Sequence, residues 1–282
     1  MNKLADLGLK AGMVPFDKRA AHFRRLLVAN AGRREGMGFL LHKIIMAAGL
    51  LRAGYAMEQA VISFARQRLD DLYETCRKGA YDIYIGEDEY AGIPRALRNK
   101  RFVKPELTPD GELRLPYIHD IYLLAHFPGD AKDAATARKI DAVVRYVLDP
   151  RYRALKDGYG YLRQQDGDHV HHYAIGWSAH LPDCSKRSLG GYERARIVQR
   201  TELMAHFAAA AETRSFRDAL AHLETYRTER GTYLFPRDYL REQQSGYWVT
   251  GAYMALEANR RSSRTIEVES TFRMLKIKRL AA

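Results

Sequence analysis

The chain has 282 residues, enough for one large domain or two small ones with a substantial core. Hydrophobic residues make up 46% of it and charged residues 28%, ordinary values for a globular protein that exclude the disordered and fibrous classes. The 46 Lys and Arg residues against 34 Asp and Glu give a net charge of +12, which is compatible with binding to phosphate groups but does not establish it.

Three features predict a cytoplasmic protein. With only Cys76 and Cys184, the chain cannot form a disulfide framework, which favours a reducing compartment. The first ten residues contain no uninterrupted apolar stretch, so we expect no signal peptide. The longest apolar run, residues 39–51, contains His42 and Lys43 and is too short to span a bilayer, so we expect a buried helix there.

Residues 1–79 form a predicted N-terminal helical segment. Basic and apolar residues alternate over 18–30, residues 39–56 are apolar on nearly every side, and apolar residues recur over 57–76 close to the helical period. Gly79 is a natural helix stop. We therefore predict two or three packed helices.

Residues 80–116 are predicted to be an ordered connector that wraps the surface. Four of the nine prolines lie here, together with the turn pair Asp110-Gly111. Residues 81–85 are a candidate short strand, and the apolar side chains of Ile83, Phe102 and Val103 are atypical of a free linker.

Residues 117–282 contain an internal repeat. Leu-Leu-Ala-His-Phe at 123–127 returns as Leu-Met-Ala-His-Phe at 203–207, and an amphipathic helix follows each copy. Each helix leads into a glycine-aromatic turn, at 158–162 and 231–235, and then into a Gly-Trp element that ends at Trp177 and Trp248. We expect 117–177 and 197–248 to superpose, with both tryptophans buried at helix starts.

This order of landmarks resembles the α/α-toroid superfamily, which includes terpene cyclases and protein prenyltransferase β-subunits. The residues that match the superfamily's glycine-aromatic, Gln and Gly-Trp pattern are Gly158, Tyr161, Gln164, Gly176 and Trp177 in the first copy and Gly231, Phe235, Gln243, Gly246 and Trp248 in the second. The resemblance implies an all-α fold of paired-helix repeats that form an α/α toroid or a curved solenoid. The resemblance implies no particular activity. The Asp-x-Asp-Asp acid motif of the cyclases is absent, and no Asp, Cys and His residues recur at the spacing of the prenyltransferase zinc ligands.

Two groups of residues are candidate metal sites, for Zn²⁺ or Mg²⁺. Zinc needs three or four converging His, Cys or carboxylate ligands, which His169, His171, His172 and Cys184 can supply; otherwise these histidines belong to a polar loop. Asp70 and Glu74 share one helix face and match a diphosphate-Mg²⁺ pattern, or they are ordinary solvated charges. The chain has no phosphate loop, dinucleotide fingerprint or nucleophile elbow, and no other cofactor is expected.

The candidate catalytic residues are two histidines and two carboxylates. His126 and His206 occupy equivalent repeat positions, where they either face a central cavity or bridge the same structural turn. Asp120 and Glu202 lie near them and can form an acid/base pair if the fold brings them together.

These observations leave two functional hypotheses. The first is a toroid-like protein whose cavity binds a small or lipid-like ligand, either with or without converting it chemically. The alternative is a non-catalytic basic module of helical repeats that binds nucleic acid or a protein partner. A deep cavity lined by Asp120, His126 and His206 favours the first hypothesis, and a continuous basic groove favours the second.

Overall fold

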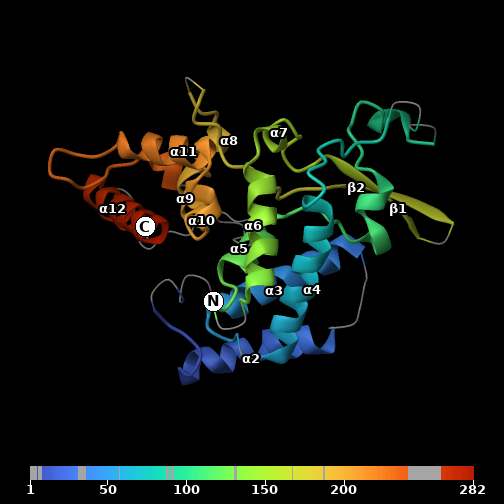
Figure 1. Ribbon diagram of the computed structural model, residues 1–282, viewed down its shortest axis with the longest axis horizontal. Coiled ribbons are helices and arrows are strands. Elements are labelled where there is room, and N and C mark those ends of the chain that lie inside the picture. The colour runs from blue at the N-terminus through green and yellow to red at the C-terminus, as the bar shows by residue number, and fades with distance from the viewer. Residues whose placement is uncertain are drawn as a thin grey trace.

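The computed structural model describes residues 5, 8–30, 36–56, 58–86, 89, 92–129, 132–166, 168–186, 188–240 and 262–282 (Figure 1). This part of the chain is mainly helical, as expected. The expected positions of Gln243, Gly246 and Trp248 lie outside the described residues, so the second Gly-Trp element stays a prediction.

The N-terminal helices form as their sequence patterns predict. They are α2 (Val14–Ala29), α3 (Gly36–Arg52) and α4 (Gln59–Cys76). Helix α4 buries one stripe at helical spacing, from Val61 and Phe64 to Leu72 and Cys76. Gly79 adopts φ +59° just beyond it, a conformation that glycine tolerates best, which explains why the chain turns there.

The connector between α4 and α5 (Ile118–Ala125) is ordered and contributes to the core. It contains the short 3-10 helices η2 (Arg95–Leu97), η3 (Pro105–Leu107) and η4 (Pro109–Gly111). The candidate strand at 81–85 is reduced to a single bridge between Tyr84 and Val103. Its apolar residues are buried, which is the physical reason that this proline-rich stretch is fixed in place; they are Ile83, Ile93, Phe102, Val103, Leu113 and Leu115.

Several of the helices pack in two series of neighbours (Figure 1). In one, α3 contacts α5, α5 contacts α9, and α9 contacts α12. In the other, α4 contacts α6, and α6 contacts α10. The remaining bounds are α6 (Ala134–Leu148), α7 (Pro150–Arg153), α8 (Gly191–Arg194), α9 (Ile197–Met204), α10 (Ala208–Ala211), α11 (Arg214–Glu224), η6 (Arg237–Leu240) and α12 (Ser263–Ala281).

An antiparallel hairpin corrects the all-α expectation. Strand β1 (Tyr161–Asp166) pairs with β2 (His169–Ala174), where the sequence analysis expected a turn and a polar loop. Tyr161 is held by the distant connector: its N–H donates to the Arg101 carbonyl at 2.9 Å, and its carbonyl accepts from Val103 N–H at 2.8 Å. The hairpin therefore depends on a contact about sixty residues away, which local periodicity does not reveal.

The first glycine-aromatic turn has a left-handed backbone at three successive residues. Gly158, Tyr159 and Gly160 have φ values of +78°, +64° and +106°. A Cβ atom on Gly160 would lie 2.4 Å from the Arg101 carbonyl oxygen, so only glycine fits there. Tyr159 is fully buried, and its hydroxyl donates to the Pro116 carbonyl at 2.7 Å. This landmark is therefore explained by the close approach of two backbone segments.

The second copy of the turn is similar only in part. Gly231 again has a left-handed φ of +79°, within a turn closed by the bridge between Arg227 and Tyr233. The chain then continues into η6, and the residues described up to Leu240 contain no strand that corresponds to β1. Trp177 also differs from expectation: it is half-buried, has φ +62° and follows β2, and no helix starts at it.

Candidate functional site

Asp120 is held in a buried ion pair with Arg68. Arg68 of α4 donates to both of its carboxylate oxygens at 2.8 Å, and Tyr117 N–H donates to Oδ2 at 2.8 Å. Both side chains of the ion pair are buried. Asp120 thus neutralises a buried guanidinium and caps the start of α5, and these contacts occupy the oxygens that an acid/base catalyst would use.

Glu202 also has its own cationic partners. Its carboxylate lies 3.1 Å from Arg273 Nη1 and 2.7 Å from Lys276 Nζ, both on α12. This cluster joins α9 to α12. Asp120 and Glu202 are thus held by ionic partners on two different helices. The hypothesis that they act as one acid/base pair stays a prediction.

His126 and His206 do lie together. Their ring centroids are 5.1 Å apart at an interplanar angle of 72°, at the carboxyl ends of α5 and α9. The repeat therefore places its two histidines at one contact between equivalent helices. A catalytic role for the pair stays a prediction.

The predicted zinc ligands do not converge. Alternation along β2 puts His169 and His171 on one face, with ring centroids 6.4 Å apart, whereas His172 packs edge-on against Phe102. Burial raises the pKa of the Cys184 thiol to about 12, which disfavours the thiolate that binds metal. Within the described ranges, no group of three His, Cys, Asp or Glu side chains is placed to hold a metal ion.

The predicted Mg²⁺ pair is likewise engaged elsewhere. Asp70 lies 2.5 Å from Lys139 Nζ on α6, and Glu74 lies 2.9 Å from Arg77 Nη2 on its own helix. These contacts are ordinary surface ion pairs, so the solvated-charge interpretation describes them.

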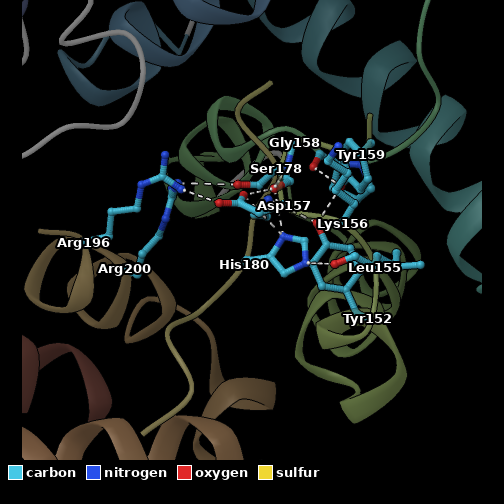
Figure 2. A network of polar contacts seen from close by, with 12 residues as sticks. Tyr152, Leu155, Lys156, Asp157, Gly158, Tyr159, Ser178, His180, Arg196 and Arg200 are labelled. Carbon is cyan, nitrogen blue, oxygen red and sulfur yellow. Dashed lines mark hydrogen bonds and ion pairs between the residues drawn. The ribbon is translucent and has the colours of Figure 1, made fainter. Parts of the chain in front are cut away.

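A buried polar network instead forms where the 155–159 turn meets residues 178–180 (Figure 2). Ser178 Oγ donates to Asp157 Oδ1 at 2.6 Å, accepts from Gly158 N–H at 2.8 Å and shares a 2.8 Å hydrogen bond with His180 Nδ1. Ser178 is fully buried and is the central residue of the three. A catalytic triad requires histidine in the centre and an exposed serine, so this network holds the turn together and does not activate a nucleophile.

Arg196, just before α9, and Arg200 within α9 reach this network from the opposite side (Figure 2). Arg196 Nη1 lies 3.3 Å from Asp157 Oδ2, and Arg200 Nη2 donates to the Ser178 carbonyl at 3.4 Å. The Arg196 side chain is 18% exposed and lies over the Tyr192 ring, whereas Arg200 is fully buried. Burial lowers the pKa of Arg196 to about 9 and of Arg200 to about 10, so both stay protonated at neutral pH.

Unused hydrogen-bonding capacity is concentrated around Arg200. Within the part of the chain that the structure describes, its Nε and Nη1 atoms have no hydrogen-bond partner. The same holds for both ring nitrogens of His119 and for the Oε1 atom of Gln199. Burial, together with the positive charge of Arg200, lowers the pKa of His119 to about 3, so this imidazole is neutral. Gln199 is oriented by a hydrogen bond from its amide to the Tyr122 hydroxyl on α5. These groups lie at the contact between α5 and α9.

This cluster is not among the sites predicted from the sequence, although the repeat contains a signal for it. The 80-residue offset that relates His126 to His206 also relates His119 to Gln199 and Asp120 to Arg200. Polar residues thus recur at equivalent positions of α5 and α9. Buried polar groups at repeated positions are candidates for a shared structural or binding role.

A hollow of about 630 Å³ lies elsewhere, beside the amino-terminal half of α12. It is lined by Arg230, Thr232, Ser263, Arg264, Glu267, Val268 and Thr271. Arg230 is already paired with Glu267 at 2.8 Å, and none of the predicted catalytic residues lines this hollow. It therefore gives no support to the predicted site.

No family model, curated protein or solved structure matches this chain. In the part of the chain that the structure describes, no helix combines the length and the apolar character needed to cross a membrane.

Proposed function

We propose that this protein binds a small polar ligand at the contact between α5 and α9. The observation that carries the proposal is Arg200, whose fully buried guanidinium has two nitrogen atoms without a hydrogen-bond partner among the described residues. His119 and Gln199 add unpartnered polar atoms from both helices. A ligand with several donors and acceptors would satisfy all three side chains.

An ordinary protein core leaves few buried polar groups without hydrogen-bond partners. Leaving a buried polar group unpaired costs about 1–3 kcal/mol, and more for a charged group. An uncompensated buried charge is costlier still, since removing one partner of a buried ion pair costs about 3–5 kcal/mol. A polar cluster around Arg200 is therefore better explained by a partner that completes it than by packing alone.

We further propose that these helices belong to an α/α-toroid-like array. Two observations support this: α3, α5, α9 and α12 contact one another in succession, and His126 meets His206 at equivalent repeat positions. In such an array α5 and α9 would be inner helices, and the cluster around Arg200 would face the centre. A ligand of this site would then be a small molecule and not a polymer.

The test is to release and identify bound small molecules from the full-length protein. Native protein would be exchanged into fresh buffer and denatured, and the released molecules identified by mass spectrometry. We expect one compound in stoichiometric amount from wild-type protein and from the control R214M, because Arg214 is highly exposed on α11. R200M should fold and release none. The proposal would be wrong if wild-type protein released nothing and R200M were more stable than wild type.

Nucleic-acid binding is the second candidate, because the net charge is +12. Many basic side chains, however, are paired with carboxylates on other elements. Examples are Lys139 with Asp70, Arg145 with Glu212 and Arg194 with Asp238. Phosphates would have to compete with these partners, so we rank this function second.

A further inference from the structure

We infer that the ligand carries an oxyanion group, a phosphate or a carboxylate, which Arg200 binds from the interior and Arg196 from the entrance. This inference rests on the proposed function and specifies the chemistry of its ligand. Three observations support it: the partners of the described buried cations, the charge balance at the start of α9, and the different depths of the two arginines.

Arg200 is the exception among the buried cations. Among the described residues, the buried Lys and Arg side chains are Lys43, Arg68, Arg200 and Arg273. Three of these side chains lie close to a carboxylate: Lys43 is 3.8 Å from Glu112, Arg68 is 2.8 Å from Asp120, and Arg273 is 3.1 Å from Glu202. Arg200 forms no ion pair with any described residue. Among the described residues, Arg200 is therefore the one buried cation that no carboxylate contacts directly.

The charge balance around Arg200 leaves a net positive charge. Asp157 is the nearby carboxylate, and it lies 3.3 Å from Arg196 while also accepting from Ser178. One carboxylate thus serves two guanidinium groups, and Asp157 is itself partly exposed. A neutral ligand would satisfy the hydrogen bonds of Arg200 but would leave its charge buried without a counterion. An oxyanion satisfies both requirements, and guanidinium groups bind oxyanions with charge-assisted hydrogen bonds.

The two arginines lie at different depths in the molecule. Arg196 is the residue that precedes α9, and Arg200 follows it by four positions, about one helical turn. Figure 2 shows both guanidinium groups directed toward the 157–158 turn. Arg196 is partly exposed and Arg200 is fully buried, so an anion would meet the first and reach the second. His119 and Gln199, which are uncharged, would then contact the neutral part of the ligand.

The experiment measures thermal unfolding of the full-length protein against inorganic phosphate and against acetate, with sodium chloride at matched ionic strength as reference. We expect the Tm of wild-type protein to rise progressively with one of these anions above the chloride reference. A response to phosphate alone identifies a phosphate ligand, and a response to acetate alone identifies a carboxylate ligand. R200K keeps the charge but loses the planar fork, so it should need at least about tenfold more anion for the same shift.

R200Q should abolish the response, and R214Q should retain it. An equal anion response in R200Q would assign the effect to surface charge and would overturn the inference. The identity of the released molecule separates this inference from the proposed function. If wild-type protein releases a neutral compound and R200M does not, the proposed function holds and the inference of an oxyanion ligand is wrong. If no molecule is released and no anion stabilises the protein, both are wrong.

Discussion

Replacing Asp120 by asparagine removes one charge from the ion pair that joins α4 to α5. The perturbation is small in volume, but Arg68 and Asp120 are 2% and 0% exposed, so Arg68 would remain buried without a counterion. Arg68 also donates to the carbonyls of Leu113 and Leu115, and these contacts would persist in the variant. The loss therefore reports mainly on the charge pair.

Breaking a buried pair by removing one partner costs about 3–5 kcal/mol. For a chain of this length each 1 kcal/mol lowers the Tm by roughly 2 °C, so D120N should melt about 6–10 °C below wild type. In the double variant R68M/D120N no charge is left uncompensated. Its loss should therefore be smaller than the sum of the two single losses.

Urea unfolding followed by circular dichroism would measure these differences. The control is D70N, which removes a surface partner of Lys139 and should change stability by less than about 1 kcal/mol. If D120N were as stable as D70N, or if the losses of R68M and D120N were simply additive, the structural role assigned to Asp120 would be refuted. Its candidacy as a catalytic acid would then regain support.

Three further predictions address the turn, the histidine and the basic surface. G160A should lose at least about 1–3 kcal/mol, because alanine must adopt φ +106° with its Cβ 2.4 Å from a carbonyl oxygen; G176A, where nothing lies within 4 Å, is the control, and equal urea midpoints would contradict the account. His119 has a pKa of about 3 in the folded protein, below its usual 6.5, so the unfolded chain takes up the proton first as the pH falls. Wild-type protein should therefore lose about 2 kcal/mol more than H119Q between pH 7 and pH 5, and parallel pH profiles would show that His119 is not buried. Duplex DNA binding at low salt should be lost near physiological ionic strength, and sub-micromolar affinity there in a salt titration would reverse our ranking of the two functions.

The sequence by itself determined the helical framework. Apolar residues at helical spacing are a local property, so α2, α3 and α4 follow from residues a few positions apart. The repeat around His126 and His206 can also be recognised from the sequence alone, and its 80-residue offset predicts that these positions are equivalent in the fold.

The tertiary structure alone decided which polar residues have partners. Asp120 is tied to Arg68, which is 52 positions away, and the hairpin forms because Tyr161 bonds to the distant connector. Strand alternation separates His171 from His172, although the two are adjacent in the chain. Arg200 stands out only when the partner of every other buried cation is known. Local sequence patterns predict helices, but the burial and pairing of a side chain depend on contacts between distant segments. These contacts determine whether a charged group stays hydrated, gains a counterion or has neither.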